Sequence, residues 1–212
     1  MRTLKHPLVF LILLDLIMVA GRVLYTSEIT YAFLVWNLLL ALFPFLLSSW
    51  AQQKQWPQGK RLWLLALGFL WLFFLPNAPY ILSDFYHLRT KTDMATIWID
   101  ILMIFSYSLT GLMMFYWSLL QAFELWKKVI KRGAEPFIIA VLLLCSIAIY
   151  PGRYLRLNSW DLFTQPDEVL SAFLTALSSS SFWRITLPYF LFLTLGYVFV
   201  RLLKSSKSST LR

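Results

Sequence analysis

The segment "RLWLLALGFLWLFFLPNAPYILSDFYHL", residues 61–88, decides how the chain folds. Its first part is apolar enough for a membrane-spanning helix, which needs roughly 20 such residues. Pro76 then lacks an N–H and clashes with the preceding turn. Pro79 disfavours a helical conformation at Ala78. We therefore expect a span over Leu62–Leu82 that is broken between Pro76 and Pro79.

Polar residues follow this break. Asn77 suits the N-cap of a second, short helix over about residues 78–88, on which Tyr80, Asp84 and His87 would share one face. A helix broken at membrane depth exposes backbone groups that lipid cannot satisfy, so they must face protein or water. Transporters use such half-helix ends as ligand sites. The alternative is a simple kink followed by a polar loop.

The composition indicates a membrane protein throughout, because 59% of the 212 residues are hydrophobic and only 14% are charged. Six segments are apolar enough to span: Leu8–Tyr25, Ile29–Trp50, Leu62–Leu82, Trp98–Phe123, Pro136–Tyr150 and Ile185–Val200. We predict an all-α fold, a polytopic membrane bundle of six transmembrane helices. It forms a single domain over residues 1–203, followed by a short disordered cytoplasmic tail over 204–212.

The basic residues orient this bundle. Of the 19 Lys and Arg residues, 13 lie at the two termini and in the second and fourth connections, which share one side of the membrane. The positive-inside rule makes that side the cytoplasm. We expect a cell-membrane protein with both termini cytoplasmic and the lipid bilayer as its partner. Because topology explains the net charge of +9, the sequence argues against a nucleic-acid partner.

The fifth span also runs outward and ends in "YPGRYLRLNSWD", residues 150–161. Pro151 and Gly152 are expected to stop its helix, leaving Arg153 and Arg156 beyond it. A further helix near 166–178 opens with Pro166 and two acids in its first turn. We expect this helix to lie along the outer membrane surface.

The topology brings charged residues from separate segments to the outer face: Arg22, Asp84, His87, Asp100, Arg153, Arg156 and Asp161. They are either solvated loop charges or the lining of one pocket. A buried arginine needs a carboxylate or an anionic ligand. We expect Arg153 or Arg156 to pair with one of the three acids around a cavity lined by Asn77, Tyr80 and His87.

Asp15 lies deep inside the first span, where a carboxylate costs roughly 2.5–3.5 kcal/mol on insertion scales and needs a partner. Asn37, at similar depth in the second span, is the leading candidate. Other candidates lie on the fourth span: Ser106, Tyr107 and Ser108. A structural hydrogen bond and a relay role both remain open.

The motifs "FLPNAPYILSDFYHL" (74–88) and "GRYLRLNSWD" (152–161), with the acid of "WIDIL" (98–102), resemble a bacterial integral membrane family catalogued as domain of unknown function 1361. The resemblance covers essentially the whole chain. It carries over to these positions: Pro76, Asn77, Pro79, Tyr80, Asp84, His87, Asp100, Arg153, Arg156, Asn158, Ser159, Trp160 and Asp161. Ser83 stands where a threonine is common, and Leu157 where an aromatic residue is expected. The family name implies no activity.

The chain contains no established catalytic template, so the residues leave open whether it is an enzyme. Asp84 and His87 could act as a catalytic acid–base pair, or ligate a divalent metal together with Asp100 or Asp161. Paired arginines suit a phosphate or carboxylate. The candidate ligand-binding residues are Asn77, Tyr80, Asp100, Arg153, Arg156, Asn158 and Asp161.

Three functions follow from these residues. The first is binding or transport of a small polar or anionic ligand, such as an anionic lipid, in a charged pocket at the extracytoplasmic face. The second is a membrane hydrolase or transferase acting on a lipid head group or a lipid-linked substrate. The third is a structural subunit of a membrane complex.

Overall fold

The computed structural model describes residues 2–54, 61–90, 94–129, 133–157 and 161–209. All described secondary structure is helical: α1 (Arg2–Thr26), α2 (Ala32–Gln53), α3 (Arg61–Phe74), α4 (Asn77–Tyr80), the 3-10 helix η1 (Ile81–Thr90), α5 (Met94–Val129), α6 (Ala134–Tyr154), α7 (Asp161–Thr164), α8 (Pro166–Leu177) and α9 (Ser180–Ser209). The predicted all-helical bundle is confirmed.

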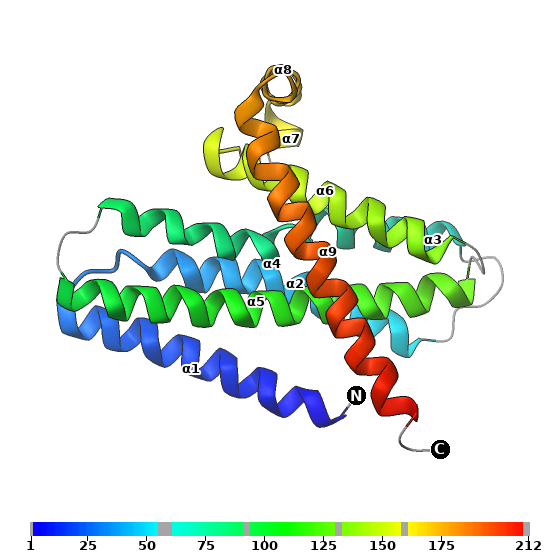
Figure 1. The fold of residues 1–212 in the computed structure, drawn as a ribbon, viewed down its shortest axis with the longest axis horizontal. Coiled ribbons are helices and arrows are strands. Elements are labelled where there is room, and N and C mark those ends of the chain that lie inside the picture. The colour runs from blue at the N-terminus through cyan, green and yellow to red at the C-terminus, as the bar shows by residue number, and fades with distance from the viewer. Residues whose placement is uncertain (1, 55–60, 91–93, 130–132, 158–160, 210–212) are drawn as a thin grey trace.

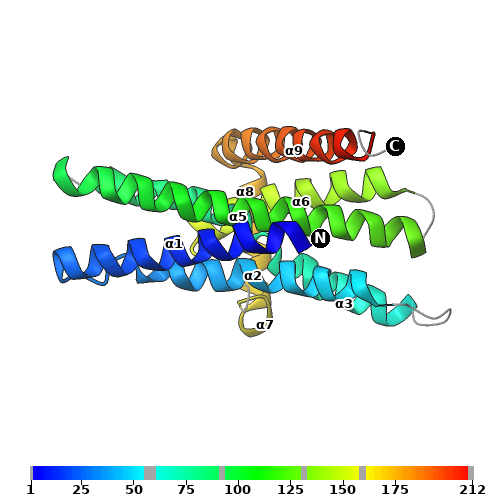
Figure 2. The ribbon, with the colours of Figure 1, turned by 90° about the horizontal axis from the view of Figure 1, so that it is seen from below.

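Six helical stretches are long and apolar enough to cross a membrane: Pro7–Thr26, Ala32–Gln53, Leu62–Arg89, Thr96–Lys128, Ala134–Tyr154 and Ser180–Ser206. The last two exceed their predicted lengths. The first five follow the long axis of the molecule (Figure 1). The connections α1–α2 and η1–α5 meet at one end of this bundle, and α2–α3 and α5–α6 meet at the other (Figures 1 and 2). The molecule is therefore a polytopic membrane bundle.

Helix α5 forms the core of the bundle. Half of the most apolar 18-residue stretch of this span is buried inside the protein, whereas the corresponding share is 17% to 39% in the other spans. It packs against α1, α2, α4, η1, α6 and α9. Gly111 permits a close approach of the α4 backbone, because a Cβ there would lie 2.8 Å from the carbonyl oxygen of Ala78. Small residues allow such backbone proximity between membrane helices.

The predicted break falls at Leu75 and Pro76, at the start of the expected interval. Beyond it, Ala78 is helical rather than extended, because the Tyr80 amide still donates to the carbonyl of Pro76 at 3.1 Å. Pro76, not Asn77, occupies the N-cap position. The chain then tightens into 3-10 geometry instead of the expected α-helix.

Asn77 repairs the backbone at this break. The Ala78 amide donates to Leu75 at 3.1 Å, leaving the Phe74 carbonyl without its usual i+4 donor. The Asn77 side chain donates to that carbonyl at 2.9 Å. A kink in an apolar helix needs such a replacement, because lipid offers no donors.

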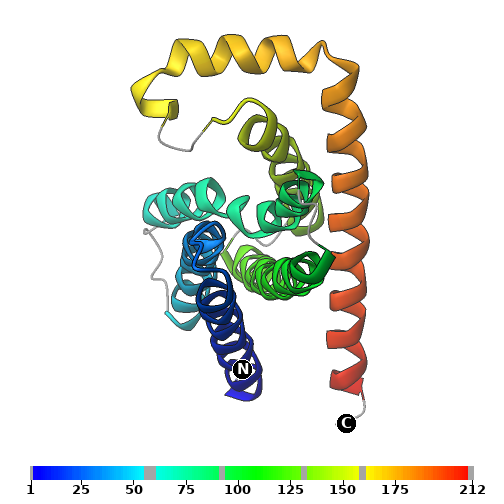
Figure 3. The ribbon, with the colours of Figure 1, turned by 90° about the vertical axis from the view of Figure 1, so that its left-hand side faces the viewer.

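The C-terminal part departs from the bundle axis. Helix α6 continues through Pro151 and Gly152 to Tyr154, four residues beyond the predicted end at Tyr150. The predicted helix near 166–178 is present as α8, which lies crosswise to the bundle, while α9 crosses α6 steeply (Figures 1 and 3). Helix α9 extends to Ser209, into the segment expected to be disordered.

Candidate functional site

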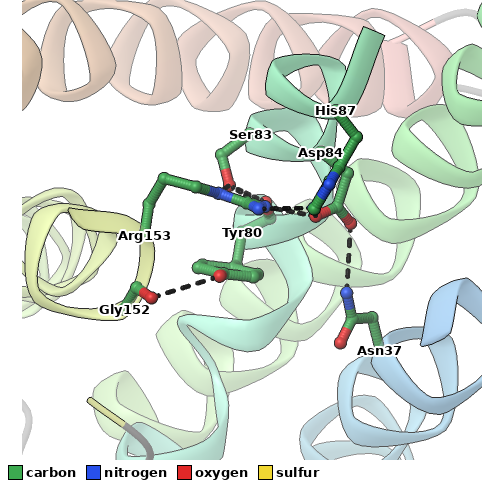
Figure 4. Close-up of polar contacts among 7 residues, drawn as sticks. All are labelled: Asn37, Tyr80, Ser83, Asp84, His87, Gly152 and Arg153. Carbon is green, nitrogen blue, oxygen red and sulfur yellow. Dashed lines mark hydrogen bonds and ion pairs between the residues drawn. The ribbon is translucent and has the colours of Figure 1, made fainter. Parts of the chain in front are cut away.

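A polar centre forms where the last turn of α6 meets η1. We define it as Asn37, Tyr80, Ser83, Asp84, His87 and Arg153 (Figure 4). A 3-10 helix has three residues per turn, so Asp84 and His87 share a face despite the changed geometry. The break and the end of the fifth span, predicted to converge, therefore meet here.

Arg153 connects the members of the polar centre (Figure 4). Its Nε and Nη2 donate to Ser83 Oγ at 2.9 and 2.7 Å. Nη2 also donates to the carboxylate of Asp84. Nη1 lies 3.0 Å from Nε2 of His87, and because arginine can only donate, this histidine nitrogen accepts. Four of the five guanidinium N–H groups thus bond to η1.

Asp84 is enclosed on both sides. The residue is 1% exposed, and its second carboxylate oxygen accepts a hydrogen bond from Asn37 Nδ2 at 3.0 Å. Buried carboxylates require such compensation. Asn37 therefore donates its side-chain hydrogen bond to Asp84 rather than to Asp15, and the predicted Asn37–Asp15 pair is wrong. Similar depth along two spans does not say which neighbour a helix face meets.

Tyr80 supports the arginine from below (Figure 4). The guanidinium carbon lies 4.6 Å from the centroid of the Tyr80 ring, within cation–π range. The Tyr80 hydroxyl donates to the Gly152 carbonyl at 3.3 Å. A Cβ at Gly152 would lie 2.9 Å from this ring. The predicted ligand-contacting Tyr80 therefore holds α6 against the broken helix and orients Arg153.

His87 is the exposed member of the centre. Its side chain is 44% exposed, against 8% for Arg153 and 1% for Asp84. Its ring packs on Phe33, with 4.9 Å between the ring centroids. Nε2 of His87 is 4.0 Å from Oδ1 of Asp84, which is longer than a hydrogen bond. A ligand arriving from outside would therefore reach His87 first.

Basic side chains border this exposed edge. Arg89 is exposed and its guanidinium carbon lies 3.8 Å from the Tyr86 ring centroid. Tyr86 in turn meets Tyr154 of α6, with ring centroids 6.0 Å apart. Arg156 follows Tyr154 by two residues, has a φ of 57° and is exposed. We name the group His87, Arg89 and Arg156 the basic edge.

Asp100 belongs to a second ion pair. Its Oδ1 accepts from Arg22 Nε at 2.6 Å, and its Oδ2 accepts from the Tyr31 hydroxyl at 2.8 Å. Burial, and then the hydrogen bond to Asp100, raise the pKa of Tyr31, which keeps its hydroxyl a donor. This pair links α1 to α5, so the expected single pocket divides into two clusters. Tyr31, Phe33 and His87 connect them through successive ring contacts.

Asp15 finds its partner on α5. Its Oδ1 accepts a hydrogen bond from Ser106 Oγ at 2.5 Å. Ser106 was among the candidates predicted on the fourth span. The contact joins α1 to α5 within the core, away from the polar centre.

The remaining predicted residues are dispersed. Asn77 bonds to backbone and is not part of the polar centre. Asp161 opens α7 and is partly buried. Asn158, Ser159 and Trp160 lie outside the described residues.

The polar centre is poorly suited to a metal ion. Arg153 occupies both atoms that would coordinate it, the Asp84 carboxylate oxygen and His87 Nε2. Any metal would have to displace this cation. Within the described ranges, no group of three or more His, Cys, Asp or Glu residues is placed to hold a metal ion.

Ser83, Tyr31 and Phe33 were missed as site residues. Ser83 directly precedes Asp84 and its hydroxyl stands where the resembled family commonly has a threonine, a signal that pointed to a retained hydroxyl. Tyr31 and Phe33 begin the second span and look like ordinary interfacial aromatics. Nothing in the sequence pattern distinguishes them.

Comparison with known proteins gives one match. No curated protein and no solved structure matches the chain. The family model described as "Protein of unknown function (DUF1361)" matches residues 36–195. The matched range contains every residue of the polar centre and omits all of α1, including Asp15 and Arg22. Because it spans most of the chain, the protein belongs to the DUF1361 family of proteins of unknown function.

Proposed function

We propose that this protein binds a small anionic ligand, such as a phosphate-bearing head group, at the basic edge of the polar centre. The observation that carries the proposal is the contrast within the centre. Arg153 and Asp84 satisfy each other in the interior, while His87, bonded to the same guanidinium, is 44% exposed on its side chain. The buried pair of Arg153 and Asp84, which carries no net charge, thus holds the accessible side chain of His87 in a set position.

The charge of the basic edge supports an anion as the ligand. Arg89 and Arg156 are both exposed and flank the Tyr86–Tyr154 contact, which joins η1 to the end of α6. Guanidinium groups suit phosphate and carboxylate because their donors form a planar fork. The interior pair contributes no net charge, so the positive charge of the basic edge comes from Arg89 and Arg156.

Two alternatives receive less support. An acid–base enzyme would use Asp84 and His87 together. However, Asp84 Oδ1 and His87 Nε2 are 4.0 Å apart, and Arg153 bonds to both atoms. A purely structural role would not require a half-exposed histidine held by a buried arginine. Binding therefore uses more of the observed geometry than either alternative.

The positive-inside pattern supports placing this site on the extracytoplasmic side. The polar centre is built on η1 and the end of α6, and η1 leads into α5, which begins at the end of the bundle where α1 ends (Figure 1). The connections with clustered Lys and Arg lie at the other end. A ligand would then approach from outside the cell membrane, with both termini in the cytoplasm.

The test follows ligand binding through the NMR signals of the His87 imidazole. The chain has two histidines, so His6→Gln leaves one. The protein, labelled with ¹⁵N-histidine and held in nanodiscs of zwitterionic lipid, is titrated with glycerol 3-phosphate. We expect a saturable shift of the imidazole signals. Arg89→Gln/Arg156→Gln should weaken the apparent affinity by about tenfold or more, or roughly 1.4 kcal/mol.

Arg184→Gln is the matched control, because Arg184 is an exposed arginine whose side chain donates to Ser180 and Ser181 of its own helix. It should leave the titration unchanged. A flat titration in the otherwise native protein, or equal affinity in the double variant, would refute the proposal.

A further inference from the structure

The opposite end of the bundle contains an apolar pocket of about 310 Å³. It lies between α2, α3, α5 and α6, on residues separate from the polar centre. Its lining is Leu47, Ser48, Ala51, Leu64, Leu65, Leu67, Gly68, Phe69, Trp71, Leu72, Ala122, Leu125, Trp126 and Phe137. Ligand pockets in proteins typically measure about 300–1,000 Å³ and are mostly apolar.

The polar atoms in this wall are already engaged. Trp71 Nε1 donates to Ser118 Oγ at 2.7 Å, and Ser48 Oγ donates to Gln121 Oε1 at 2.7 Å. Phe137 stacks on Trp126, with 3.8 Å between ring centroids. The pocket thus presents hydrocarbon and aromatic faces, which suit an acyl chain rather than a polar molecule.

Two cations follow pocket-lining residues closely in the chain. Lys54 is the C-cap of α2, three positions after the lining residue Ala51, and Lys128 lies on α5, three positions after Leu125. Both lysines are exposed. Two other cations at this end pair with acids: Arg201 with Glu135 and Lys204 with Glu124, each at 3.1 Å. Among described side chains, Lys54 and Lys128 have no carboxylate within 4.0 Å.

We propose that this pocket binds one acyl chain of an anionic phospholipid, whose phosphate lies against Lys54 and Lys128. The bilayer supplies the occupant at the depth of the pocket, since all lining residues lie within spanning helices. Basic pockets between membrane helices on the cytoplasmic side bind anionic head groups in this way. The site is independent of the basic edge.

Two glycines provide a matched pair of variants. A Cβ at Gly68, in the pocket lining, would meet nothing within 4 Å, and the same is true of Gly21 on α1. Gly68→Trp therefore fills the pocket, whereas Gly21→Trp adds the same bulk to a different span. Gly68→Leu is the smaller filling variant if the tryptophan impairs folding, as judged by size-exclusion chromatography.

The experiment is native mass spectrometry of protein released from nanodiscs that contain phosphatidylglycerol and phosphatidylcholine with identical acyl chains. The wild type should retain phosphatidylglycerol in preference. Gly68→Trp should reduce the retained lipid by about tenfold, and Gly21→Trp should not. Lys54→Gln/Lys128→Gln should abolish the preference for phosphatidylglycerol while some phosphatidylcholine is still retained.

Equal lipid retention in the two tryptophan variants would overturn the pocket, and an undiminished preference in the lysine variant would overturn the phosphate contact. Arg184→Gln, which removes an exposed arginine outside both proposed sites, should retain phosphatidylglycerol as the wild type does. An equal loss in this variant would show that retention follows total charge and would contradict the proposal.

Discussion

Two buried arginine–aspartate pairs hold this bundle together, and they differ in one respect. Arg22 and Asp100 are enclosed completely, with side chains 3% and 0% exposed, and Tyr31 completes the shell of the carboxylate. Arg153 and Asp84 are nearly as buried, but the same guanidinium also holds a histidine that is 44% exposed. The first pair ends within the protein, whereas the second reaches the surface.

The comparison shows how equal chemistry can serve different purposes. Removing one partner of a buried ion pair leaves an uncompensated charge, while replacing both with apolar residues is often tolerated. Stability should therefore recover in a double apolar variant of either pair. Ligand binding should be unaffected in the double variant of Arg22 and Asp100, which do not reach the surface. It should be weakened in the double variant of Arg153 and Asp84, which hold the exposed His87. The predictions below follow this distinction.

The largest effect is expected from Asp100→Ala. Arg22 would remain buried without its carboxylate, at a cost of about 3–5 kcal/mol. Thermal unfolding in detergent, followed by tryptophan fluorescence, should show a large decrease in Tm. Arg22→Met/Asp100→Leu should restore most of it. A single variant as stable as the wild type would show that the pair contributes little.

Asp84→Ala should destabilise less. Arg153 would retain its bonds to Ser83 and His87 near the surface, so the loss is that of charged hydrogen bonds, about 1.5–3 kcal/mol. The same unfolding measurement ranks the two variants. If Asp84→Ala were the more damaging, the second pair would be the main structural element and the comparison would be reversed.

Gly111→Ala tests the packing that positions η1. The added Cβ would lie 2.8 Å from the backbone oxygen of Ala78, which cannot move without shifting the broken helix. We expect a loss of about 1–3 kcal/mol, as for other overpacked cores. Gly21→Ala, where nothing lies within 4 Å, is the control and should be neutral or slightly stabilising. Equal behaviour of the two variants would argue against close packing at Gly111.

The smallest effect is expected from Asn77→Ala. It removes the side-chain donor to the Phe74 carbonyl, a contact worth about 1 kcal/mol. Asn77→Asp is informative beside it, because an ionised carboxylate cannot donate to a carbonyl and should not rescue. A rescue by aspartate would mean that Asn77 acts through another contact.

Much of the fold was predictable because hydrophobic length and proline chemistry are local properties. They predicted the six spans, the break near Pro76 and the helix near 166–178. The helix end predicted at Pro151 was wrong, because a proline within a span can be tolerated when neighbouring helices satisfy the freed backbone groups. The extension of α9 beyond residue 203 was missed, since a polar tail has no apolar periodicity to mark it.

The site was predictable only in part. The convergence of Asp84 and Arg153 followed from the two motifs ending on the same side. The partners of Asn37 and Asp100 did not follow, and Ser106 was only one of several candidates for Asp15, because partners depend on the rotation of each helix about its own axis. Hydropathy measures depth and carries little information on rotation when a span is apolar all round.

The most direct test compares the two double apolar variants in the glycerol 3-phosphate titration of His87. Both carry His6→Gln, and both must first show near-native Tm values. We predict that Arg22→Met/Asp100→Leu binds with unchanged affinity, whereas Asp84→Leu/Arg153→Met binds at least about tenfold more weakly. Equal affinities in the two variants would contradict the assignment of the polar centre as the binding site.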